Sequence, residues 1–138
     1  MILEFDQNGN LPPGIHVATI QEVEARFTNN IQRKRLFQAL LKVLGILRGC
    51  NCPEVYLNGS FITTKSEPED YDLCYEPTGI NGTEEFKQFL ETRETRKKEY
   101  LGDIFPRMPQ PPYETDHVED WQIGRDGEVK GIIRIILR

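Results

Sequence analysis

The sequence predicts an α/β (α+β) fold, in which helices pack on a small mixed sheet. Two observations support this. Apolar residues recur at three- and four-residue intervals in the first half of the chain, and short β-prone stretches dominate the second half. Packing one sheet against helices is the natural way to bury both kinds of apolar pattern.

Three helices and one shorter helix are expected. Thr19-Ile-Gln-Glu22 is a capping-box pattern, so a helix begins there. A longer helix is expected over residues 29–48. Thr83 and the two glutamates after it begin a third helix, with acidic residues at its N-terminal end and basic residues toward its C-terminal end, as the helix dipole favours. A short helix is expected near 118–121. The apolar positions that support the second helix are Ile31, Leu36, Leu40, Val43, Leu44 and Leu47.

Four strands are expected near residues 54–58, 70–75, 101–105 and 131–137. Residues 70–75 alternate polar with apolar side chains, as a half-buried strand does. Residues 1–18 contain two prolines and two glycines and are predicted to form an irregular arm. The whole chain, 1–138, is expected to form one domain, since a domain has roughly 150 residues.

Composition narrows the class of protein. The 17 basic and 22 acidic residues give a net charge of −5, which argues against a protein that coats nucleic acid. No run approaches the roughly 20 apolar residues of a membrane span, and no secretion signal is evident. The three cysteines do not suggest a disulfide framework or a zinc site, so we expect free thiols and a cytoplasmic protein with no membrane partner.

Chemistry is expected around Gly59-Ser60 and Asp70-Tyr-Asp72. A glycine at a turn lets a phosphate approach the main chain, and the serine hydroxyl adds a donor. Asp70 and Asp72 are two residues apart on an expected strand, so their carboxylates share a face and repel each other unless a cation lies between them. Magnesium prefers such oxygen ligands together with substrate phosphates.

These residues resemble a known signature. Leu57-Asn-Gly-Ser60, nine intervening residues and then Asp70-Tyr-Asp-Leu73 resemble the motif of the polymerase-β-like nucleotidyltransferases, whose minimal prokaryotic members are closest in size. Residues 10–16 and 130–133 resemble an uncharacterised nucleotidyltransferase-like family. The resemblance implies a nucleotidyltransferase-like fold. It also implies an enzyme that uses Mg²⁺ to move a nucleoside monophosphate from a nucleoside triphosphate to a hydroxyl acceptor.

The resemblance also implies residue roles. Asp70 and Asp72 would bind magnesium, and a third carboxylate on a neighbouring strand would complete the metal site and help to deprotonate the acceptor. Asp103 is our choice for that position. Gly59 and Ser60 would hold the terminal phosphates, and Lys65 is a further candidate for phosphate binding. The alternatives to the third carboxylate are Glu114, Asp116 and Asp120.

Two functions remain open. Minimal nucleotidyltransferases often belong to toxin–antitoxin pairs, so the acceptor would be a protein side chain or an RNA 3′ end, and a partner protein is expected. The segment after Ser60 lacks the arginine common there in that group. This favours an alternative, a catalytically inactive scaffold that acts by binding another protein. The sequence leaves the nucleotide and the oligomeric state undefined.

Other polar clusters are interpreted more simply. The basic runs 33–35 and 93–98 are predicted to be solvated helix faces, with an acceptor groove at 93–98 as the alternative. Trp121 is predicted to pack in the core, with base stacking as the alternative.

Overall fold

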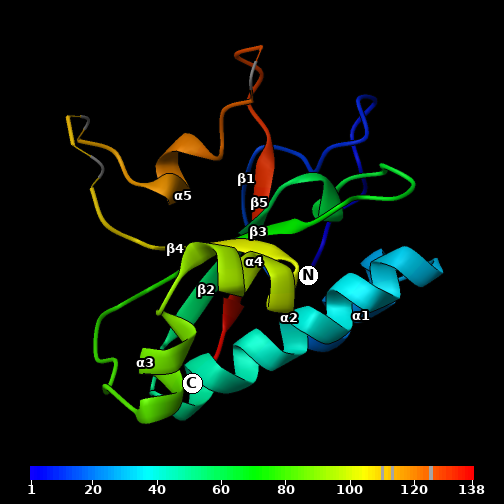
Figure 1. The fold of residues 1–138 in the computed structure, drawn as a ribbon. Helices are drawn as coiled ribbons and strands as arrows, with labels where there is room; N and C mark the ends of the chain where they lie inside the picture. The colour runs from blue at the N-terminus through cyan, green and yellow to red at the C-terminus, as the bar shows by residue number, and fades with distance from the viewer. Residues whose placement is uncertain (110, 113, 125) are drawn as a thin grey trace.

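The computed structural model describes residues 1–109, 111–112, 114–124 and 126–138, and it confirms an α/β fold. A five-stranded mixed sheet has the order β1-β5-β2-β3-β4, and helices pack on it (Figure 1). β1 and β5 are parallel, as are β3 and β4, whereas β2 is antiparallel to both of its neighbours. The strands are β1 (Gly14–Val17), β2 (Glu54–Asn58), β3 (Tyr71–Tyr75), β4 (Gly102–Pro106) and β5 (Gly131–Ile136).

The helices begin where polar side chains can cap them. Thr19 forms the predicted capping box with Glu22 at the start of α1, and the Asn30 side chain accepts a hydrogen bond from the Arg33 amide at the start of α2. The helices are α1 (Ile20–Phe27), α2 (Ile31–Gly49), α3 (Glu84–Phe89), α4 (Arg93–Tyr100) and α5 (His117–Asp120), and a short 3-10 turn, η1 (Ser60–Ile62), follows β2.

Two expectations about the elements need correction. The arm expected to be irregular contains β1, which pairs with β5 from Gly14 to Val17. The helix expected from Thr83 through the basic run is two helices, because the chain leaves the helical path after Phe89 and the side chain of Thr92 caps a new helix by accepting from the Thr95 amide.

The sheet separates two apolar clusters of unequal size. The larger cluster joins the apolar side of α2, including Leu40 and Leu47, to strand residues such as Leu57 and Leu73. A smaller cluster lies on the opposite face, where Val118 of α5 and Trp121 pack on the strands. Alternate strand residues therefore face the helices, and the residues between them, among them Asp72 and Asp103, face the side of α5.

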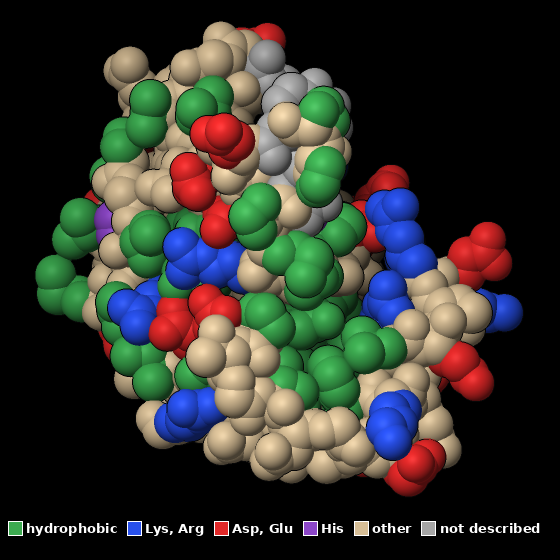
Figure 2. All heavy atoms as spheres, turned by 90° about the vertical axis from the view of Figure 1, so that its left-hand side faces the viewer, with side chains coloured by type: hydrophobic (Ala, Val, Ile, Leu, Met, Phe, Trp, Pro, Cys, Tyr) green, Lys and Arg blue, Asp and Glu red, His purple; other side chains and the backbone are tan. Residues whose placement is uncertain are grey.

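The surface carries no large field of one sign on the face drawn in Figure 2. Acidic and basic side chains are interspersed there, with hydrophobic side chains between them. Within the described part of the chain, no helix is both long and apolar enough to cross a membrane.

Candidate functional site

The site lies at one end of the three neighbouring strands β2, β3 and β4. β2 ends at Asn58 where β3 begins, because the two strands are antiparallel and Asn58 pairs with Asp72. In the parallel pair β3–β4, Asp72 lies opposite Asp103. Adjacent strands are about 4.8 Å apart, so the topology alone brings the two carboxylates together.

The turn after β2 lies directly against the carboxylate of Asp72. Gly59 has a φ of +87°, in the left-handed region that favours glycine. A Cβ built at Gly59 would lie 2.9 Å from Oδ2 of Asp72. A side chain at this position would therefore clash with the carboxylate, and the glycine allows the turn and the acid to share one site.

An open cavity of about 540 Å³ connects these groups. Asp70 and Asp72 line it, and so does the basic residue Lys130. Asp103 does not line the cavity. Its other lining residues are Asn58, Gly59, Ser60, Thr63, Lys65, Asp120, Trp121, Ile123 and Gly124.

The ionised form of the Asp72 carboxyl is disfavoured in this arrangement. Burial in the first place, and then the charges of Asp70 and Asp103, raise the pKa of its carboxyl to about 6, while Lys130 and Lys97 oppose the shift. The carboxylate of Asp72 forms no hydrogen bond or ion pair within the described residues. A cation at Asp72 would therefore relieve two costs, the desolvation and the repulsion between like charges.

A lysine already contacts the other two carboxylates. Lys97 Nζ lies 3.3 Å from Asp70 Oδ2 and 3.2 Å from Asp103 Oδ2. Arg93 Nη2 lies 3.2 Å from Asp103 Oδ1. These ion pairs raise the pKa of Lys97. The basic run on α4 was predicted to be a solvated face, and α4 indeed buries none of its residues. Arg93 and Lys97 are exposed and also pair with Asp103, because β4 follows α4 closely and brings Asp103 beneath them.

The residues fit magnesium in part. Mg²⁺ is commonly held by one or two carboxylates together with substrate phosphates, and Asp70 and Asp72 provide such a pair on the cavity. Among the described residues, however, no group of three or more His, Cys, Asp or Glu is arranged to hold a metal ion. Asp103 forms ion pairs with Lys97 and Arg93, so its carboxylate is not free to act as a third metal ligand.

The three alternatives to Asp103 belong to α5 or to the residues just before it. Asp120 lines the cavity, although it projects from the end of α5 rather than from a strand. Asp116 caps α5 and pairs with Arg107 at 3.0 Å, and Glu114 is exposed. Asp103 is therefore the one of the four that lies beside Asp72 in the sheet, and Asp120 is the one on the cavity wall.

The model of a family of unknown function, DUF6932, matches residues 3–136. The chain belongs to this family. No curated protein and no solved structure matches the chain. The matched residues of this DUF6932 chain include every residue of the site described above and all five strands of the sheet.

In this DUF6932 chain a buried arginine holds the loop that forms part of the cavity wall. Arg33, at the start of α2, is 3% exposed. Its guanidinium donates to the carbonyls of Phe61 at 2.5 Å, Thr63 at 2.7 Å and Lys65 at 2.6 Å, and more weakly to those of Phe27 and Ser60. The prediction of a solvated face is wrong for Arg33, which instead fixes the loop that carries Ser60 and Lys65.

Sequence reasoning also missed Lys130, which precedes β5 and lines the cavity. The only local signal was a cation next to a β-branched strand. Trp121 is half-buried and its ring packs near Phe105 and His117, in line with the predicted packing role. It also lines the cavity, and base stacking there stays a prediction. Cys50, Cys52 and Cys74 are free and buried, as expected.

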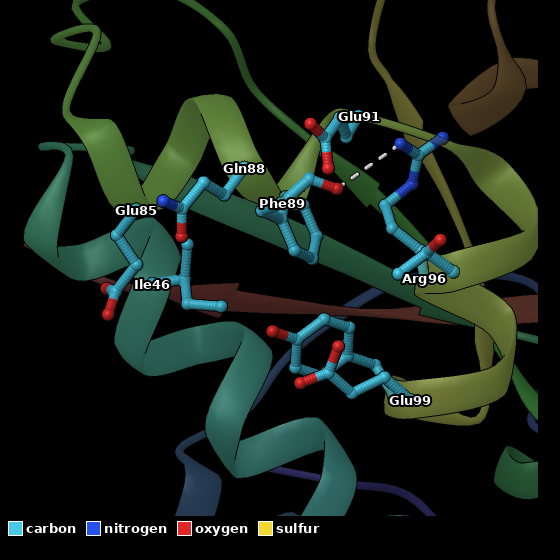
Figure 3. Close-up of a pocket in the computed structure, with 9 residues that line it drawn as sticks. Ile46, Glu85, Gln88, Phe89, Glu91, Arg96 and Glu99 are labelled. Carbon is cyan, nitrogen blue, oxygen red and sulfur yellow. Dashed lines mark hydrogen bonds between the residues drawn. The ribbon is translucent and has the colours of Figure 1, made fainter.

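A second cavity, of about 410 Å³, lies between α2, α3 and α4 (Figure 3). Glu85, Glu91 and Glu99 contribute to its wall, and Arg96 donates a hydrogen bond to the carbonyl of Phe89. Arg96 belongs to the basic run considered as an acceptor groove, but none of the residues predicted to bind metal or nucleotide lines this cavity. Its three carboxylates make it a poor site for a polyphosphate.

Proposed function

We propose that the protein is a magnesium-dependent nucleotidyltransferase that moves a nucleoside monophosphate from a nucleoside triphosphate to a hydroxyl acceptor. The contact between Gly59 and Asp72 carries this proposal. It joins a turn suited to phosphate with a carboxylate pair suited to a divalent cation, at one cavity. The resemblance of residues 57–73 to the polymerase-β-like signature supports the same assignment.

The groups around the cavity have complementary roles in this proposal. Asp70 and Asp72 would hold magnesium, which when bound neutralises charge on the triphosphate. Ser60, Lys65 and Lys130 would donate to phosphate oxygens, and Trp121 offers an apolar wall to the base. The cavity volume of about 540 Å³ lies within the range typical of small-molecule sites. Catalysis would depend chiefly on positioning and on charge neutralisation.

Asp103 would act as third ligand and base only after Lys97 and Arg93 release it. The acceptor in the proposal is a protein side chain or an RNA 3′ end. A partner protein, as in a toxin–antitoxin pair, follows from the resemblance to minimal nucleotidyltransferases.

One observation favours a second candidate function, an inactive scaffold that binds a partner protein. Lys97 bridges Asp70 and Asp103, where it supplies positive charge that an enzyme would take from a metal. A nucleotidyltransferase-like fold that had lost its metal would gain stability from such a lysine, because it neutralises the clustered carboxylates.

Titration calorimetry with nucleoside triphosphates, with and without Mg²⁺, separates the two. The enzyme is supported by metal-dependent binding that is lost in Asp70→Asn/Asp72→Asn and kept in Glu69→Gln, an exposed acid next to the site. Incubation with α-labelled triphosphate, with the protein itself and total RNA as acceptors, should then release pyrophosphate. Failure of all four triphosphates to bind the wild type, with or without Mg²⁺, would refute the enzyme.

A further inference from the structure

A third cavity lies behind the loop that follows η1, away from the carboxylates. It is open, has a volume of about 220 Å³, and is formed by the end of α1, the start of α2 and residues 63–66. Thr63 and Lys65 line both this cavity and the one described above. The loop 63–66 is therefore a shared wall, and we call this third space the rear cavity.

The charge of the rear cavity is entirely positive. Arg26, Arg33 and Lys65 line it, and none of its lining residues is an aspartate or a glutamate. Arg33 is almost completely buried and is bonded only to carbonyl oxygens. Burial lowers the pKa of Arg33, and no neighbouring carboxylate offsets that effect. Three basic residues therefore line one space with no counter-charge in its wall.

Arg26 has unused hydrogen-bonding capacity there. Its guanidinium carbon lies 4.3 Å from the centre of the Phe5 ring, so the group is held against an aromatic face. Its Nη2 is inaccessible to solvent and has no hydrogen-bond partner in the described residues. Leaving a charged donor unpaired is costly, and a bound acceptor would remove that cost.

We propose that the rear cavity binds a phosphate group, either free or carried by a larger molecule. A guanidinium with free donors matches the oxygens of a phosphate, and the polar side chains of Asn29 and Thr64 complete the wall. A water molecule takes about 30 Å³, so the cavity has room for the five heavy atoms of a phosphate group and a few waters. The proposal is independent of the nucleotidyltransferase function. Through Thr63 and Lys65, however, an anion here would affect the wall of the main cavity.

Titration with inorganic phosphate, followed by amide NMR at constant ionic strength, tests this site. Saturable shifts are expected at Asn29, Thr64 and Ser66. The affinity should fall about tenfold or more in Arg26→Met, because a charge-assisted bidentate contact is lost. The loss should be smaller in Arg26→Lys, which preserves the charge but not the bidentate contact and guards against a folding defect. The affinity should be unchanged in Arg35→Met, an exposed residue of α2.

Two further variants separate the rear cavity from the main one. Lys130→Met and Asp70→Asn/Asp72→Asn alter only the main cavity, so both should keep the phosphate response at Asn29 and Ser66. Shifts confined to Ser60 and Lys130 that survive Arg26→Met would overturn the proposal, as would the absence of any saturable shift. A parallel titration with phosphoethanolamine distinguishes the source: tighter binding of the monoester indicates a phosphorylated molecule, and binding of inorganic phosphate alone indicates the free ion.

Discussion

Replacing Asp72 with asparagine should stabilise the protein near neutral pH. The carboxyl of Asp72 has its pKa raised from an ordinary value of 3.8 to about 6, chiefly by burial and then by Asp70 and Asp103. The native state therefore holds a proton at Asp72 more tightly than the unfolded chain does. Between pH 3.8 and 6 the native state binds more protons, so raising the pH through this window lowers the free energy of unfolding.

The size of the effect follows from the two pKa values. A difference of about 2 pH units corresponds to about 3 kcal/mol, and the partial exposure of Asp72 reduces the expected gain to about 1–2 kcal/mol. Asp72→Asn should reach this gain above about pH 7, when the wild-type carboxyl is ionised in both states. The gain should disappear below about pH 4, when it is protonated in both.

Urea unfolding followed by circular dichroism between pH 3.5 and 8 measures this difference. Glu69→Gln is the matched control, since this neighbouring carboxylate is exposed and its removal should change stability by less than about 0.5 kcal/mol at any pH. A stability difference between Asp72→Asn and wild type that did not change with pH would refute the reasoning, because clustered carboxylates would then not destabilise the fold. Addition of Mg²⁺ should shrink the difference if the ion binds Asp72.

Three further substitutions test the contacts around the cavity. Arg33→Met should lower the free energy of unfolding by about 3–4 kcal/mol in urea titrations, because three close carbonyls lose a charged donor. A loss below about 1 kcal/mol, similar to that of Arg35→Met, would show that Arg33 does not hold the loop 61–65 in place. Gly59→Ala should lower the free energy of unfolding by about 2 kcal/mol and abolish triphosphate binding in calorimetry. Gly127 also has a positive φ but has open space for a Cβ, so Gly127→Ala should lower the free energy of unfolding by only about 1 kcal/mol. Equal losses would exclude a steric contact. Lys97→Met should tighten Mg²⁺ binding by about threefold or more in calorimetric titrations, since it frees two carboxylates, and unchanged affinity would show that the lysine does not compete with the metal.

The sheet was predictable wherever the signal was local. The strands expected near 54–58, 70–75, 101–105 and 131–137 all exist, with bounds shifted by no more than one residue. β1 was missed because its partner β5 lies more than 100 positions further along the chain, and four residues after two prolines give little local pattern. The break between α3 and α4 was missed although Thr92 is a good capping residue, because the charge pattern favoured one continuous helix.

The site was predictable only on the side that the motif describes. Local spacing indicated that Gly59, Asp70 and Asp72 belong together, and the structure brings them to one cavity. Spacing cannot tell which face of a helix meets a later strand, so the pairing of Lys97 with Asp103 gave no signal. Arg33 gave none either, since a basic triplet at a helix start does not reveal which of its members turns inward.

The position of β5 has a consequence for how this chain folds. β5 comes after every other element in the chain, yet in the sheet it lies between β1 and β2, and its residue Arg134 pairs with Glu54 from 80 positions earlier. Until β5 docks, β1 has no neighbour and one side of β2 is unpaired. Contacts of such long range slow folding, and an open strand invites pairing with other chains. We therefore expect that chaperones which shield exposed strands raise the yield of this protein, and that a chain cut before Gly131 aggregates.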